Sequence, residues 1–211
     1  MTTLATLLGA LTLGCAVVPC IAEHRPTNIY QASARLPQNV RRVAVLPVTV
    51  AQPDLTTEIG RDDLEPVLYS ELRKANVFEI VVVSREQLRS LTGRTEWKTL
   101  DELPREFFER LRMDTGCDAV MFCQLVHYRP YPPIAVGWDL KLVDSRKSQI
   151  LWAVDEVFNA GEGSTARAAR HYYAAHIQTS SPVTDSWSIL QSPRRFTQYA
   201  VNAVFATLSS R

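Results

Sequence analysis

The 211-residue chain lacks an excess of charge of either sign, and this limits the classes of molecule that it can bind by charge alone. Its 23 lysines and arginines are balanced by 22 acidic residues, which leaves a formal net charge of +1 at pH 7. A nucleic-acid-binding domain needs concentrated positive charge to displace counterions, so we expect no nucleic acid among the partners. Hydrophobic residues make up 46% of the chain, enough to bury a core, which excludes a disordered chain.

Cysteine and histidine are equally scarce, with four residues of each. Cys117 and Cys123 fall in one expected strand, about 20 Å apart at 3.3 Å per residue, which is too far for a disulfide. Their even spacing predicts that both lie on one face of the sheet, in the core. His171 and His176 are five residues apart on an expected helix and do not form a metal-binding face, and His127 ends a strand. We therefore expect no metal and no cofactor.

Motifs for catalysis are also missing. The chain has no GxSxG nucleophile elbow, and Gly161-Glu162-Gly163-Ser164 departs from the glycine pattern of a phosphate-binding loop. The sequence therefore predicts no catalytic residues and a protein that is not an enzyme.

The first 22 residues contain no Lys, Arg, Asp or Glu and read MTTLATLLGALTLGCAVVPCIA. A membrane-spanning helix needs about 20 predominantly apolar residues, whereas this stretch is diluted by Thr and Gly and interrupted by Pro19. Its composition favours a secretory signal.

Within this stretch, Leu13-Gly14-Cys15 followed by Ala16 resembles the lipobox of bacterial lipoproteins, in which a small residue precedes the cysteine that becomes the acylated N-terminus. The resemblance implies a signal peptide over residues 1–14 and lipidation, for example by palmitate, at Cys15. It also implies sorting to the outer membrane, facing the periplasm, because Ala16 is not Asp. More than one acyl chain gives a stable membrane anchor.

Two alternatives to this anchor remain open. The N-terminal stretch fits an uncleaved signal anchor, and it also fits an ordinary secretory signal in which Cys15 is incidental. Cys20 is a second candidate for lipidation, but Pro19 directly before it disfavours cleavage there.

The remaining chain divides into a tether and one domain. Residues 15–40 are rich in Pro and small polar residues without a period, which predicts a lipid-anchored tether. Residues 41–211 are predicted to be a single α/β (α+β) domain, with a core over 41–160 and a C-terminal helical extension over 161–211. The expected strands are 43–50, 77–83, 119–128, 134–143 and 150–158, and the expected helices follow Asp62, Ser84, Pro104, Ser164 and Ser192.

The predicted order is β-α-β-α-α-β-β-β-α-α. Strands separated by helices are expected to be parallel neighbours, and 134–143 with 150–158 form an antiparallel hairpin. We therefore predict a mixed sheet of about five strands with helices packed on it.

Four segments in this order resemble the small α/β domain of three envelope protein families. These families are the curli-secretion lipoproteins, the lipoprotein activators of penicillin-binding proteins and the N-terminal domain of the Tol system's periplasmic protein. The matching segments are RRVAVLPV (41–48), LRKANVFEIVVVSREQL (72–88), TGCDAVMFCQLV (115–126) and LKLVDSRKSQILWAVDEVF (140–158). Curli-type subunits insert long hairpins that build a membrane barrel, and the loops here are too short for them, so pore formation is not implied.

Four residues are predicted to form a partner surface. Tyr128 and Tyr131 lie in a segment rich in proline, and tyrosine is favoured at interfaces. Arg194 and Arg195 lie in the first turn of the last helix, where the helix dipole disfavours cations, so a partner is one explanation for them.

These patterns favour a non-enzymatic binding or assembly factor of the cell envelope, which is held at the periplasmic face of the outer membrane by a lipid anchor and binds an envelope protein partner. A subunit of a secretion or transport complex is the first alternative, and an envelope hydrolase is the second. The sequence leaves the oligomeric state open.

Overall fold

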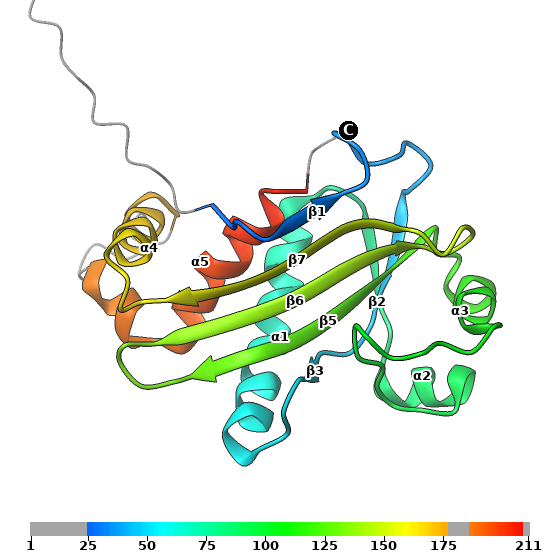
Figure 1. The fold of residues 1–211 in the computed structure, drawn as a ribbon, viewed down its shortest axis with the longest axis horizontal. Helices are drawn as coiled ribbons and strands as arrows, with labels where there is room; N and C mark the ends of the chain where they lie inside the picture. The colour runs from blue at the N-terminus through cyan, green and yellow to red at the C-terminus, as the bar shows by residue number, and fades with distance from the viewer. Residues whose placement is uncertain (1–24, 177–185, 209–211) are drawn as a thin grey trace, which may run out of the picture.

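The computed structural model describes residues 25–176 and 186–208, and these residues form one mixed sheet with helices on both faces (Figure 1). The strands are β1 (Ile29–Gln31), β2 (Arg42–Val45), β3 (Thr49–Val50), β4 (Glu79–Val82), β5 (Ala119–Arg129), β6 (Ala135–Asp144) and β7 (Ile150–Asn159). The helices are α1 (Leu55–Ala75), α2 (Arg85–Thr92), α3 (Phe107–Thr115), α4 (Gly163–His176), α5 (Pro193–Phe205) and a 3-10 helix, η2 (Ser186–Gln191).

The strand order is β1-β7-β6-β5-β2-β4, with β3 paired to β5. Strands β2, β3, β4 and β5 pair in parallel, and β5, β6, β7 and β1 pair antiparallel. The prediction of a single α/β domain with a mixed sheet is confirmed. The sheet has seven strands, two more than expected. The expected strand 43–50 is divided into β2 and β3, and β1, three residues long, is too short to show a period in the sequence.

Helix boundaries follow local capping residues. Ser84 caps α2 in a reciprocal pair with Gln87, and Ser192 caps α5 with a proline at its first position, both as predicted. The predicted start of the first long helix near Asp62 is wrong, because Asp54 caps α1 eight residues earlier and accepts hydrogen bonds from the backbone of the next turn. Pro66 consequently lies inside α1 and not in its first turn.

Helices α1, α4 and α5 pack on one face of the sheet, which we call the helix-covered face; α1 and α5 lie behind the strands in Figure 1. The central strands bury a continuous apolar layer against them, namely Met121, Cys123, Val136, Trp138, Leu140, Leu142, Trp152, Val154 and Phe158. Helices α2 and α3 cover part of the opposite face, around β2 and the start of β5, where Trp97 and Phe107 pack edge to face with ring centroids 5.3 Å apart.

Two predictions about position are corrected by this arrangement. Cys117 and Cys123 are both free and buried, but they belong to opposite faces, because Cys117 precedes β5 and is not part of its alternation. Residues 15–40 were predicted as tether, yet β1 within this range pairs antiparallel with β7, and Leu36 and Val40 are buried.

Among the described helices, none combines the length and apolar character that crossing a membrane requires.

Candidate functional site

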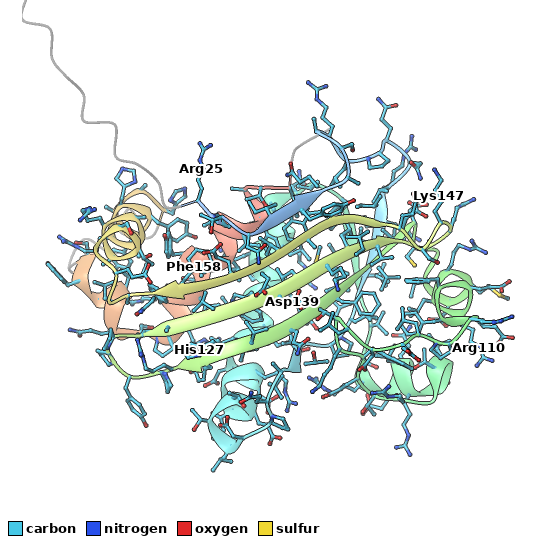
Figure 2. All side chains as sticks on the ribbon, viewed as in Figure 1. Arg25, Arg110, His127, Asp139, Lys147 and Phe158 are labelled. Atoms are coloured by element: carbon cyan, nitrogen blue, oxygen red, sulfur yellow. The ribbon has the colours of Figure 1, made fainter. Side chains whose placement is uncertain are left out.

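Helices leave the outer part of one sheet face uncovered, on the side opposite α1 and α5. Along β6, Trp138 and Leu140 are fully buried on the helix-covered face, whereas the alternating residues Asp139 and Lys141 point the other way and are half-buried. Asp139 lies near the middle of this surface, which faces the viewer (Figure 2). We call this surface the open face, and its residues are Tyr30, Gln124, His127, Gly137, Asp139, Lys141, Ala153, Asp155 and Val157.

Close strand packing builds an apolar patch at one end of the open face. Gly137 on β6 pairs with His127 on β5 and Val157 on β7. A Cβ atom on Gly137 would lie 2.9 Å from a methyl carbon of Val126 and 2.9 Å from one of Val157, so these two side chains close over the glycine. Val157 remains 44% exposed. Glycine is needed here because its neighbours occupy the space of a side chain.

Two aspartates face each other at the centre of the open face. Asp139 on β6 pairs directly with Asp155 on β7, and like charges in this position destabilise a sheet. Burial raises the pKa of Asp139, and the Asp155 charge adds to this, while a hydrogen bond from Thr99 and the charge of Lys141 act in the opposite direction. The fold thus keeps an unfavourable acidic pair on a surface that no described helix covers.

A polar network joins this pair to the loop between α2 and α3. The Thr99 hydroxyl lies within hydrogen-bond distance of Asp139 and of Gln124 Oε1, the latter at 2.8 Å, and its single proton is shared between these two acceptors. Lys141 Nζ in turn donates to the Thr99 carbonyl oxygen at 2.7 Å. These bonds fix the side chains of the open face before any partner arrives, which lowers the entropy cost of binding.

The two tyrosines predicted to contact a partner, Tyr128 and Tyr131, differ in their exposure. Tyr131 lies in the β5–β6 turn and is 76% exposed. Tyr128 is half-buried instead, because its ring packs over Gly60 of α1, and this burial raises its pKa. The structure therefore turns Tyr128 toward a helix and leaves Tyr131 exposed.

The two arginines also differ in their contacts. Arg194 is exposed, whereas Arg195 is half-buried and donates to Ser188 Oγ at 3.0 Å, with its guanidinium 5.6 Å from the centre of the Tyr173 ring. Arg195 thus ties α5 to η2 and α4. The predicted lipidation residue, Cys15, lies outside the described residues.

The sequence did not reveal an ion-pair cluster that joins α1 to α2. Arg85 donates to Glu65 Oε2 at 3.1 Å and to the Val48 carbonyl oxygen at 3.1 Å, and Glu65 Oε1 accepts from the Val48 N–H at 2.9 Å. The Tyr69 hydroxyl adds a bond of 2.6 Å to Glu65, and burial raises the pKa of Tyr69. The cluster holds α1 and α2 at the carboxyl end of β2. The available signal was a charged residue, Arg85, at the first position of α2, just after the capping Ser84.

A cavity of about 480 Å³ lies between β1, α4 and α5. His171 and His176 both line it, and His176 stacks on Tyr172 with ring centroids 4.6 Å apart. Among the described residues, no group of three or more His, Cys, Asp or Glu side chains is placed to hold a metal ion.

No protein-family model and no curated protein matches the chain. Its fold is similar to that of lipoprotein GNA1162 from Neisseria meningitidis, at 17% identity over 68% of this chain and 99% of that one, with a TM-score of 0.42. It is also similar to the C-terminal domain of LpoB from Salmonella enterica, at 13% identity over 60% of this chain and 86% of that one, with a TM-score of 0.38. TolB from Acinetobacter baumannii shares 14% identity over 71% of this chain and 31% of that one, with a TM-score of 0.32.

These similarities agree in part with the resemblance predicted from the sequence motifs, and its curli-secretion part stays a prediction. At TM-scores below 0.5, they transfer no activity, site or partner to this chain.

Proposed function

We propose that this protein is a non-enzymatic binding protein of the cell envelope, anchored to the outer membrane by acyl chains on Cys15 and facing the periplasm. It engages a protein partner through the open face. The observation that carries the proposal is the content of this face, where exposed apolar side chains surround an acidic pair on strands that are otherwise well packed.

The chemistry of the face defines the kind of partner. Tyr30 and Val157 are 54% and 44% exposed, and a partner that covers them gains apolar burial. Asp139 and Asp155 lie side by side, so a lysine or arginine of the partner placed between them relieves their mutual repulsion. We infer a partner that presents a cation beside an apolar or aromatic group.

Site-specific photocrosslinking in intact cells tests the partner surface. A photoreactive amino acid at position 30 or 157 is expected to give a discrete adduct with an envelope protein. Position 59 is the matched control, because Ile59 on α1 is 54% exposed, like Tyr30, but lies outside the open face. The same adduct from position 59, or no adduct from 30 and 157, would contradict the proposal.

Metabolic labelling with a palmitate analogue tests the anchor separately. Cys15→Ser is expected to abolish the label and release the protein from membranes, while Cys20→Ser keeps both. A label that survives Cys15→Ser shows that the anchor is elsewhere, and it leaves the crosslinking result unaffected.

A further inference from the structure

A pocket of about 420 Å³ lies beside the open face, where the loop between α2 and α3 meets the β6–β7 hairpin. Its lining includes an apolar group made of the buried side chains Phe122 and Val143 and the partly exposed Leu103, Phe108 and Ile150. Pockets for small molecules span about 300–1,000 Å³ and combine an apolar lining with a few polar groups. In size and lining, this pocket belongs to that class.

The charged residues that line the pocket are mostly cations. Lys98, Arg105 and Lys141 contribute three positive charges, and Asp101 contributes one negative charge. Asp101 is already paired with Arg94, at 3.1 Å, and Arg94 does not line the pocket. The lining therefore has more positive than negative charge, although the whole chain is nearly neutral.

Two of the three cations are held in place by backbone carbonyl groups. Lys141 Nζ donates to the Thr99 carbonyl oxygen at 2.7 Å, and Lys98 Nζ donates to the Ala51 carbonyl oxygen at 3.1 Å. A lysine ammonium has three protons, so each keeps donors for a ligand after this bond is made. The carbonyl bonds thus position both ammonium groups without neutralising them.

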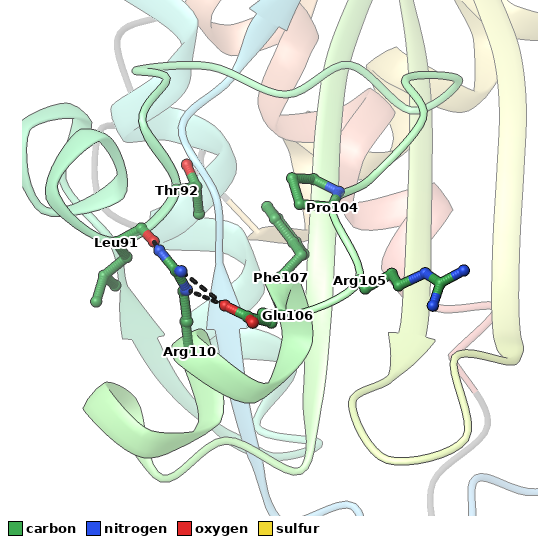
Figure 3. Close-up of a pocket in the computed structure, with 7 residues that line it drawn as sticks. All are labelled: Leu91, Thr92, Pro104, Arg105, Glu106, Phe107 and Arg110. Atoms are coloured by element: carbon green, nitrogen blue, oxygen red, sulfur yellow. Dashed lines mark hydrogen bonds and ion pairs between the residues drawn. The ribbon is translucent and has the colours of Figure 1, made fainter.

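Arg105 also lines a neighbouring pocket of about 240 Å³, but its contacts differ from those of Arg110, the other arginine there. In that pocket Arg110 forms an ion pair with Glu106 at 2.6 Å and donates to the Leu91 carbonyl oxygen at 3.1 Å. Figure 3 shows the Arg105 side chain pointing away from this pair. Within residues 25–176 and 186–208, no ion pair includes Arg105, so its guanidinium is available for a bidentate bond to a carboxylate or phosphate.

We propose that this pocket binds a small amphipathic anion, a carboxylate or phosphate head on a single aliphatic chain. The head group lies between Arg105 and Lys141, and the chain packs on Phe122, Phe108 and Ile150. This inference goes beyond the proposed partner binding. Lys141 belongs to both the open face and this pocket, but the inference rests on the pocket's cations and apolar lining and not on a protein partner.

Photoaffinity labelling of the full membrane-bound chain tests this site. The probe is dodecanoate with a diazirine in its chain, and the adduct is mapped by mass spectrometry. We expect adducts on residues 98–108 and 141–150, displaced by unlabelled dodecanoate or dodecyl phosphate but not by dodecanol. Whichever anion displaces the probe at lower concentration identifies the preferred head group. Equal displacement by dodecanol would overturn the proposal, since the cations would then have no role.

Arg105→Gln isolates the charge at an exposed loop position, so the fold is expected to persist. It is expected to weaken displacement by both anions about tenfold, the effect of losing one charge-assisted hydrogen bond. Arg89→Gln, an exposed arginine on α2 outside the pocket, is the matched control and is expected to change nothing. Unchanged displacement in Arg105→Gln, or adducts that map to the cavity between α4 and α5, would overturn the proposal.

Discussion

The two faces of the antiparallel strands carry opposite kinds of side chain, although they share the same backbone. On the helix-covered face, Val136, Trp138 and Leu140 are fully buried in succession along β6. On the open face, the residues that alternate with them are Gly137, Asp139 and Lys141. The covered face maximises apolar burial, whereas the open face keeps an acidic pair and exposed apolar groups that do not help the sheet fold.

This difference separates two kinds of constraint. Residues on the helix-covered face are expected to determine stability, because each is surrounded by protein atoms. Substitutions on the open face are expected to change the free energy of unfolding little, or to raise it, because these side chains are exposed or repel one another in the folded protein. Substitutions on the two faces test this difference. The largest expected change in the free energy of unfolding comes from the helix-covered face.

Trp138→Ala is expected to lower the free energy of unfolding by about 3–5 kcal/mol, because it leaves a large cavity beneath the helices. Trp138→Phe is expected to cost much less, since in the described part of the chain the indole Nε1 is buried without a hydrogen-bond partner. Urea unfolding followed by circular dichroism measures both. A loss below about 1 kcal/mol for the alanine variant would show that the covered face does not dominate stability.

Gly60→Ala is expected to lower the free energy of unfolding by about 1 kcal/mol, because the new Cβ lies 2.4 Å from a ring carbon of Tyr128. In a Tyr128→Ala background the clash is gone, and alanine is then expected to stabilise α1 by its helix propensity. The sign reversal between the two backgrounds is the measurement. If alanine has the same effect in both, Tyr128 does not pack on this helix.

Asp139→Asn on the open face is expected to raise the free energy of unfolding at neutral pH by about 0.5 kcal/mol, because it removes a partly buried negative charge and its repulsion from Asp155. The pKa of Asp139 is raised in the folded state, so its ionised form is the destabilised one. The original protein therefore recovers stability as the pH falls through this pKa, and the advantage of the variant disappears in acid. Unfolding at several pH values checks this, and a variant that is less stable at neutral pH would contradict it.

Val157→Ser has the smallest expected effect on stability, within about 0.5 kcal/mol, because the side chain is 44% exposed. Its effect on partner binding is expected to be larger, since it removes an apolar contact of the open face. Crosslinking from position 30 in the Val157→Ser protein measures this second effect. A variant that unfolds readily but crosslinks normally would invert the comparison between the faces.

Much of the fold could be predicted because it depends on patterns close in sequence. The alternation in residues 134–143 and 150–158 predicted the hairpin, and Ser84 with Gln87 and Ser192 with Pro193 predicted two helix starts. The first long helix was predicted too late because a second acceptable cap, Asp62, lies inside it. Short strands such as β1 are determined by their partner, β7, and not by their own residues.

The candidate site was harder to predict, because it depends on which face the helices leave uncovered. Asp139 and Asp155 are sixteen residues apart and become neighbours only through the register of β6 and β7. Lys141 and Arg105 lie on different elements and share a pocket through the path of a loop. Exposed tyrosines could be proposed from composition, but Tyr128 packs on α1 because the glycine beneath it makes room.

The pairing of β1 with β7 also sets how far the domain can reach from the membrane. If Cys15 carries the acyl chains, only residues 15–28 remain between the anchor and the sheet, which is 14 residues in place of the 26 in the predicted tether. Fully extended, 14 residues span about 50 Å and 26 span about 90 Å. A domain of this size is about 40 Å across, so an anchor at Cys15 would hold the domain within roughly one domain diameter of the lipid surface. With such an anchor, a partner would meet the domain close to the membrane, and a longer inserted linker is expected to relax that requirement.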